Sequence, residues 1–170
     1  NRLPSGENGE ICLRGPKVTQ GYWKDPEKTA AAFFGDWFRT GDVGYLDAEG
    51  FLYLTDRKSY MIIFGGVNIY PQEIEDVLFQ HPAVASVQVI GVPDERMGEE
   101  LMAWVVLREG ATVSEDDLRA FCRERMAHFK APKYIKFTTE FPMTVTGKIQ
   151  KFRIRDLMIE AHIPYIEQAA

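Results

Sequence analysis

From Met61 onward, short apolar runs alternate with stretches of helical spacing, and this alternation limits the fold more than any other feature of the chain. An apolar run bounded by turn residues indicates a strand, and apolar side chains three and four positions apart indicate a helix. Strands are expected over residues 61–64, 84–92, 101–107 and 134–137. Helices are expected over residues 71–80 and 114–126, and at the end of the segment 148–159. We therefore predict an α+β domain with a three-stranded central sheet, packed helices and a small extra hairpin.

The first 57 residues follow a different, β-rich pattern. Residues 10–14 alternate weakly, as in a strand, and residues 37–54 are typical of two strands around a turn. Asp25 can cap a short helix that begins at the next residue. Because the chain begins inside a strand-and-loop pattern, we predict that residues 1–57 are the β-rich end of a larger N-terminal domain. Residues 58–170 are predicted to form the small C-terminal domain.

The composition is that of an ordinary globular protein, with 45% hydrophobic and 26% charged residues. Trp23, Trp104 and the phenylalanines are expected to lie in the core. The formal net charge of -5 argues against a general binder of nucleic acid or of anionic membranes. An anionic ligand would therefore need local positive charge, which the basic segment 148–155 and the pair Lys130 and Lys133 can supply.

Cysteine and histidine usage argues against a disulfide scaffold and against a metal site in this chain. Cys12 and Cys122 are too few for a disulfide framework, and free thiols fit a reducing compartment. No apolar run is long enough to cross a bilayer and no signal peptide is recognisable, so a cytoplasmic location is expected. His81, His128 and His162 are scattered and lack the spacing of metal ligands.

The loop 142–148 (PMTVTGK) is almost free of charge until it ends in the ammonium group of Lys148. Pro142 and Gly147 mark a turn, and the threonine hydroxyls can hydrogen-bond their own backbone and hold the loop in shape. Gly147 leaves room beside the lysine for a bulky anionic ligand. A lysine on such a loop can be brought to a phosphate, where its charge stabilises negative charge that develops in the transition state. Lys148 is therefore the candidate catalytic residue.

Three segments, in this order, resemble the core motifs of the adenylate-forming enzymes. This superfamily comprises acyl- and aryl-CoA synthetases, the adenylation domains of nonribosomal peptide synthetases and the firefly-type luciferases. Residues 37–42 (WFRTGD) resemble its ribose-binding motif, residues 56–75 (DRKSYMIIFGGVNIYPQEIE) its hinge and glycine-turn motif, and residues 142–148 its last motif. Three motifs in the expected order, spread over residues 37–148, are far more specific than a lone Gly-Lys pair.

The resemblance implies a nucleotide-binding role for Asp42 and Arg57. Asp42 is expected at a tight turn between strands, where it can bond its own backbone or accept hydrogen bonds from two ribose hydroxyls. Arg57 can pair with Asp56 or Glu75 on the surface, or contact the ribose or phosphate of the nucleotide. In both cases the resemblance favours the second role.

The resemblance also implies a CoA site. Gly65 and Gly66 fit a hairpin turn with positive φ, and they also allow a narrow ligand close to the backbone; in the family this turn borders the tunnel for the pantetheine arm. Phe129 and Lys133 match an aromatic residue and a lysine that hold the CoA nucleotide in several CoA ligases of the family. Met97 falls where some relatives have an aromatic residue against adenine, and a thioether also offers soft apolar contact.

Lys58 and Ser59 are the expected hinge, on which the small domain turns as a mobile lid. The family usually has Asp or Lys two residues after the motif arginine, and this chain has Ser59 there. Since hinges need not be one residue type, the departure affects only the exact pivot, which is expected between Arg57 and Tyr60.

The family reaction has two steps. A carboxylate attacks the α-phosphorus of Mg-ATP to give an acyl-adenylate and pyrophosphate, and a thiol then attacks the adenylate and releases AMP. Residues 66–73 (GVNIYPQE) and 147–152 (GKIQKF) are most similar to medium- and long-chain fatty acyl-CoA synthetases. The predicted function is therefore that of the C-terminal part of an AMP-forming acyl-CoA ligase, in which the lid domain rotates between the two steps.

The implied ligands are a carboxylic acid, ATP, Mg²⁺ and CoA, with the Mg²⁺ ligands expected outside this chain. The chain alone is expected to be inactive, because no segment resembles the family's phosphate-gripping loop, and any homo-oligomer is expected to form through the N-terminal domain. Two alternatives stay open: an adenylation domain that loads a carrier protein, and a non-catalytic binding module that retains the lid fold.

Overall fold

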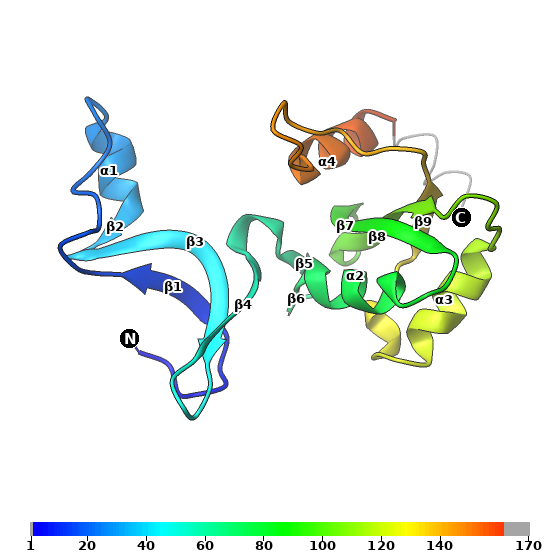
Figure 1. Ribbon diagram of the computed structural model, residues 1–170, viewed down its shortest axis with the longest axis horizontal. Coiled ribbons are helices and arrows are strands. Elements are labelled where there is room, and N and C mark those ends of the chain that lie inside the picture. The colour runs from blue at the N-terminus through cyan, green and yellow to red at the C-terminus, as the bar shows by residue number, and fades with distance from the viewer. Residues whose placement is uncertain (1, 162–170) are drawn as a thin grey trace. The chain divides into compact units, whose positions relative to one another are not determined.

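The computed structural model describes residues 2–161 and divides at residue 59 into two compact units (Figure 1). Unit 1 ends at Ser59, and unit 2 begins at Tyr60. A short 3₁₀ helix, η1 (Lys58–Tyr60), spans this division. The assignment of residues 1–57 and 58–170 to two domains of a longer protein stays a prediction.

Unit 1 is a four-stranded antiparallel sheet with one short helix. The long strand β3 (Trp37–Leu46) pairs with β1 (Gly9–Leu13), β2 (Phe33–Phe34) and β4 (Leu52–Arg57). Helix α1 (Pro26–Ala32) begins as predicted, since the Asp25 carboxylate accepts the Lys28 backbone N–H at 2.9 Å and Pro26 occupies the first turn.

Unit 2 is built on a five-stranded sheet in the order β6-β5-β8-β7, with β9 also paired to β8. The hairpin strands are β5 (Ile62–Phe64) and β6 (Val67–Ile69), and the long antiparallel pair is β7 (Val84–Asp94) and β8 (Gly98–Leu107). Strand β9 (Tyr134–Phe137) runs parallel to β8. The helices are α2 (Pro71–Phe79), α3 (Glu115–Arg123) and α4 (Lys151–Ala161), with a 3₁₀ turn, η2 (His128–Lys130), before β9.

Helices cover both faces of the β7–β8 pair, which explains why these strands have nearly continuous apolar sequences. Successive side chains of a strand point to opposite faces. One face packs against buried residues of α2 and α3, among them Ile74, Leu78 and Leu118. The other face packs against Ile154 and Met158 of α4. Figure 1 shows α4 on one side of β7 and β8, and α2 and α3 on the other. The predicted α+β fold, with three central strands, packed helices and an extra hairpin, is confirmed.

Cys122 belongs to the first of these cores, where burial raises the pKa of its thiol to about 11. At neutral pH this side chain is therefore a small protonated apolar group rather than a nucleophile.

The prediction that the tryptophans and phenylalanines lie in the core is correct for Trp104 and wrong for Trp23. Trp104 is 5% exposed and Trp23 is 88% exposed. Phe34 and Phe51 are also mostly exposed. Within the described residues of unit 1, Val43 is the only buried apolar side chain.

Truncation of Ile74 should destabilise the chain, because its side chain is completely buried between α2 and the sheet. We expect Ile74→Ala to lower the free energy of unfolding by about 2–5 kcal/mol, the range for large core cavities. Ile159→Ala is the matched control, because this second helical isoleucine is 44% exposed, and the expected change is within about 0.5 kcal/mol. Urea denaturation of both variants measures the difference, and equal losses would contradict the packing described.

Candidate functional site

Asp42 lies inside β3 and not at a turn between strands, so the predicted location is wrong. The cause is a bulge: residues 40–42 of β3 face the stretch of β1 between Glu10 and Cys12, where the register shifts. Gly41 has φ +76°, which lets the strand bend at this point. The Thr40 hydroxyl donates to the Ile11 carbonyl at 2.8 Å and accepts the Asp42 backbone N–H at 3.1 Å. The bulge thus fixes the backbone from which the Asp42 carboxylate projects.

Arg57 faces Asp42 across the sheet, so the two predicted nucleotide contacts lie together. The two residues are directly paired between β3 and β4, and Arg57 Nε lies 3.1 Å from Asp42 Oδ1. Their side chains are 62% and 33% exposed, and an ion pair this open contributes little net stability. A ligand with hydroxyl and phosphate groups can therefore exchange with this contact at small cost.

Lys58, a predicted hinge residue, is held in unit 1 by Glu10. Glu10 Oε2 accepts from Lys58 Nζ at 2.9 Å and from Arg39 NH2 at 2.7 Å. The Arg39 hydrogen bond, with a further contribution from Lys58, lowers the pKa of the Glu10 carboxyl below its ordinary value. Glu10 is separated from Arg39 and Lys58 by 29 and 48 residues, so no local sequence pattern could indicate this anchor.

Gly65 and Gly66 form the two-residue turn between β5 and β6, with φ of +55° and +85°. Such a turn favours glycine at both positions. The Gly65 N–H donates to the Met97 carbonyl at 2.8 Å, and a Cβ at Gly65 would lie 2.6 Å from the Met97 methyl group. Gly66 faces open space instead. Backbone conformation therefore favours glycine at both positions, and a side chain at Gly65 would in addition displace the flexible end of Met97.

Phe129 lies beside the same turn. Its ring stacks on Phe64, the residue before Gly65, with centroids 6.4 Å apart, and it remains 44% exposed. Three predicted contacts to the CoA site, namely the glycine turn, Met97 and Phe129, are therefore brought into one region of unit 2.

Lys133 has two carboxylate neighbours that the sequence did not reveal. Its Nζ lies 3.4 Å from Asp94 Oδ2 and 3.8 Å from Glu100 Oε2. The pKa of Lys133 is raised, mainly by hydrogen bonding to Tyr134, with contributions from Glu100 and Asp94. Since its charge is already compensated, an incoming phosphate must compete with these carboxylates.

Asp94 also shapes the turn that carries Met97. Its Oδ1 accepts the backbone N–H groups of Met97 at 2.8 Å and Arg96 at 3.0 Å. The Met97 hydrogen bond is the main reason why the pKa of Asp94 lies below its ordinary value, with Arg96 and Lys133 adding to it.

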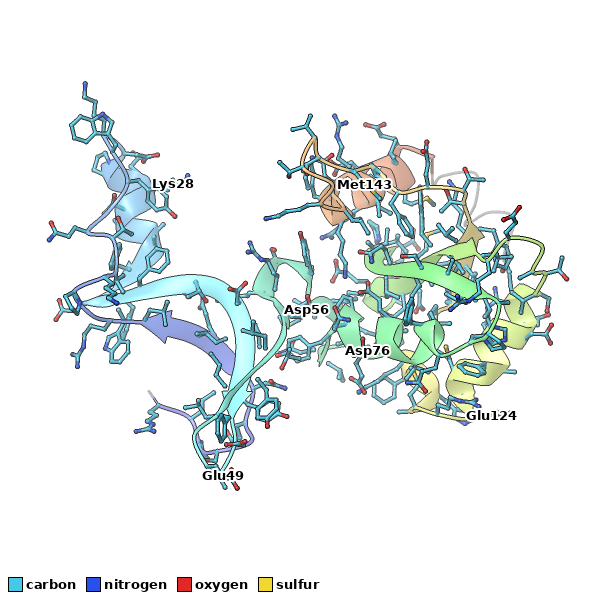
Figure 2. All side chains as sticks on the ribbon, in the orientation of Figure 1. Lys28, Glu49, Asp56, Asp76, Glu124 and Met143 are labelled. Carbon is cyan, nitrogen blue, oxygen red and sulfur yellow. The ribbon has the colours of Figure 1, made fainter. Side chains whose placement is uncertain are left out.

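Lys148 sits at the end of a tight loop just before α4; the labelled Met143 marks this loop in Figure 2. The Thr144 N–H donates to the Lys148 carbonyl at 2.8 Å, and the Lys148 N–H donates to the Thr144 hydroxyl at 3.0 Å. Gly147 has φ +80°, and its N–H donates to the Thr144 carbonyl at 2.9 Å. The Lys148 side chain is exposed, and its Nζ makes no ion pair with the described residues.

Glu99 joins the hairpin to α4 within unit 2. Its Oε2 accepts the Ile63 backbone N–H of β5 at 2.7 Å, and its Oε1 pairs with Arg155 of α4 at 2.7 Å. The strand that leads to the glycine turn and the helix that follows the Lys148 loop are thus connected by one side chain.

The described residues contain no group of three or more His, Cys, Asp or Glu side chains placed to hold a metal ion. Of the three histidines considered above, His162 lies outside the described residues. Between residues 2 and 161 no helix has both the length and the apolar character needed to span a bilayer.

Residues 73–148 match the AMP-binding enzyme C-terminal domain. The chain carries this C-terminal domain of the AMP-binding enzymes. Solved structures agree: ATP-bound MatB from Rhodopseudomonas palustris aligns over 94% of this chain with a TM-score of 0.90 and 37% sequence identity. The resemblance to the adenylate-forming family that the three motifs indicate is confirmed.

The chain is also similar to curated acyl-CoA ligases. The chain is 49% identical over 156 residues to the mitochondrial medium-chain acyl-CoA ligase ACSF2 of Bos taurus, a match that covers 91% of this chain and 25% of that protein. It is 47% identical over 156 residues to a long-chain-fatty-acid–CoA ligase of Bacillus subtilis, covering 92% of this chain and 28% of that protein. The chain also spans 32% of the MatB chain, so it corresponds to about a quarter to a third of these proteins.

Asp94 should give a pH-dependent contribution to stability. Because the pKa of Asp94 is lowered in the folded state, its contribution is present above the unfolded pKa, about 3.9, and is lost as the pH falls through the lower folded pKa. We expect Asp94→Asn to lower the free energy of unfolding by about 1 kcal/mol at pH 7, with a smaller difference from the wild type at acidic pH. Urea denaturation at several pH values measures this, and a difference that does not change with pH would contradict it.

Proposed function

We propose that this chain is the C-terminal part of an AMP-forming acyl-CoA ligase that activates a fatty acid with ATP and transfers it to CoA. The observation that carries the proposal is the Lys148 loop: an exposed ammonium group, without an ion-pair partner among residues 2–161, on a backbone fixed by reciprocal hydrogen bonds. Relatives named as medium-chain and long-chain acyl-CoA ligases support the fatty acid as the substrate class.

In the first step, Lys148 supplies positive charge to the reacting carboxylate and α-phosphate. Negative charge grows around phosphorus as the carboxylate oxygen attacks and pyrophosphate leaves, and a nearby ammonium group stabilises that charge. The hydrogen-bonded loop sets the position of the Lys148 backbone, from which the side chain carries its ammonium group to the phosphate. Asp42 would hold the ribose hydroxyls and Arg57 the ribose or phosphate, after exchange of their mutual ion pair. The Mg²⁺ that accompanies ATP would be bound by residues outside this chain.

In the second step, the thiol of CoA attacks the carbonyl carbon of the adenylate, and AMP leaves. The pantetheine arm would pass Gly66, where no described residue other than its chain neighbours has an atom within 4 Å of the Cβ position. Phe129 and Met97 offer apolar contact to the nucleotide end of CoA, and Lys133 offers charge once a phosphate displaces Asp94 or Glu100. Rotation at Lys58 and Ser59 would exchange the Lys148 surface for the glycine-turn surface between the steps.

CoA is favoured over a carrier protein because the relatives reported above are named as CoA ligases. A non-catalytic module is disfavoured by the intact Lys148 loop and the Asp42–Arg57 pair. A cytoplasmic location is part of the proposal and rests on the two free cysteines. The relative ACSF2 is a mitochondrial protein, so a reducing organelle interior is the competing location. Assembly into a homo-oligomer remains a proposal about the whole protein.

In a full-length enzyme that contains this chain, removal of the Lys148 charge should slow the first half-reaction and spare the second. Lys148→Ala should reduce adenylate formation roughly a hundredfold or more and spare thioester formation from pre-made acyl-adenylate, because the charge is needed only in the first step. ATP–pyrophosphate exchange measures the first step, and single-turnover formation of acyl-CoA measures the second. Equal losses in both would rule out the assigned role.

A side chain at Gly66 should slow only the second step. Gly66→Leu is expected to leave ATP–pyrophosphate exchange near the wild-type rate and to slow transfer to CoA at least about tenfold, because it obstructs the path of the thiol. Since leucine is also strained at positive φ, Gly110→Leu is the matched control. Gly110 has φ +72° with no atom within 4 Å of its Cβ position, and it lies outside the proposed site. If the two substitutions slow transfer to CoA equally, backbone strain explains the effect, and the placement of the pantetheine arm beside Gly66 is wrong.

A further inference from the structure

A buried ion pair connects the start of α4 to α2 and to the edge of the sheet. Lys151 Nζ donates to Glu75 Oε1 at 2.6 Å, and the two side chains are only 11% and 7% exposed. The same carboxylate oxygen accepts the backbone N–H of Val89 at 2.6 Å. Lys151 Nζ also lies 5.2 Å from the ring centroid of Tyr60. The partners Glu75 and Lys151 are separated by 76 residues.

The Glu75 carboxylate is a fixed point in unit 2. Val89 belongs to β7, which pairs only with β8 among the described strands, so its outer edge is open. Glu75 reaches this edge from α2 and satisfies a backbone donor there. Since both the sheet and α2 hold this oxygen, whatever binds to it is positioned relative to the core.

Lys151 connects the Glu75 carboxylate to the Lys148 loop. It is the first residue of α4 and follows Lys148 by three positions. The loop between them has little freedom, because Met143 pairs with Ile149 and the Gln150 N–H donates to the Pro142 carbonyl at 2.9 Å. The loop is therefore a small rigid hairpin, and the Lys151 contact anchors the chain on its C-terminal side.

Stability alone does not account for this arrangement. Taking two charges out of water is costly, and well-packed apolar side chains of similar volume often hold a structure equally well. An ion pair differs from an apolar contact in direction, since the ammonium group must meet a particular oxygen. A displacement of about 1 Å at a catalytic group can cost roughly a hundredfold in rate, so such directional control is useful next to a reacting phosphate.

We propose that Glu75 and Lys151 are positioning residues that set the place of Lys148 for adenylate formation. The inference rests on the proposed function, because it assigns the pair a role through Lys148. Neither residue would touch the nucleotide; the pair acts by fixing the loop that bears the ammonium group.

The test uses the full-length enzyme and places Lys151→Met and Glu75→Gln in two backgrounds, wild type and Lys148→Ala. In the wild-type background, each substitution should slow ATP–pyrophosphate exchange between about tenfold and a hundredfold and leave thioester formation from pre-made acyl-adenylate near its normal rate. In the Lys148→Ala background, the same substitutions should cause no further loss, because the group that they position is absent.

Two additional variants keep the test decisive. Glu73→Gln removes a carboxylate of the same helix that pairs instead with Lys130 at 2.7 Å, and exchange should be unchanged in it. If a single substitution prevents folding by stranding a buried charge, the double variant Glu75→Gln/Lys151→Met removes both charges and is assayed in its place.

The outcomes separate this inference from the proposed function. If Lys151→Met catalyses ATP–pyrophosphate exchange at the normal rate and Lys148→Ala does not, the inference is overturned and the proposed function is unaffected. Equal losses in both half-reactions, or the same loss in both backgrounds, make the pair a general structural element and also overturn it. If Lys148→Ala itself exchanges pyrophosphate normally, both proposals fail.

Discussion

Unit 2 depends on the burial of the β7–β8 pair on both faces. Val89 and Leu101 are completely buried on the side of α2 and α3, and Val92 and Met102 are completely buried on the side of α4. This two-sided burial keeps three helices in fixed positions around one sheet. Each site residue of unit 2 lies in a loop or turn beside this framework, so the packing of the sheet determines where the functional groups stand.

Much of the fold was predictable because its signals are local. Ser114 as a helix cap, the apolar run at 134–137 and the Gly65-Gly66 turn each depend on a few neighbouring residues, and all three are present in the structure. The predicted limits differ from the observed ones by a few residues, as for α3, which ends at Arg123 rather than near Met126. A hydrogen-bonded turn, Arg125 N–H to the Cys122 carbonyl, ends the helix there. Capping and turn preferences carry this information without any tertiary context.

The contacts within the candidate site were less predictable, because they join residues far apart in sequence. Asp42 was expected at a turn, yet it lies in a bulge that becomes recognisable only when β1 is placed beside β3. Lys133 was expected to supply positive charge to an anionic ligand, and its neighbours Asp94 and Glu100 could not be foreseen from the sequence. The roles of these residues in catalysis and binding stay predictions. What the structure adds is that Asp42, Arg57 and Lys133 already have charged partners, with which a ligand at these positions has to exchange.

The contacts of Glu99 affect which mutations could change the thiol acceptor of the proposed enzyme. One carboxylate contacts both the β5 backbone and Arg155 of α4, so the strand before the glycine turn and the helix after the Lys148 loop are linked directly. Under the proposed function, a backbone shift at the glycine turn that admits a bulkier thiol acceptor would also affect the helix that follows Lys148. If the proposed CoA site is correct, a change of acceptor is therefore easier to reach through the side chains of Met97 and Phe129 than through the backbone of the glycine turn.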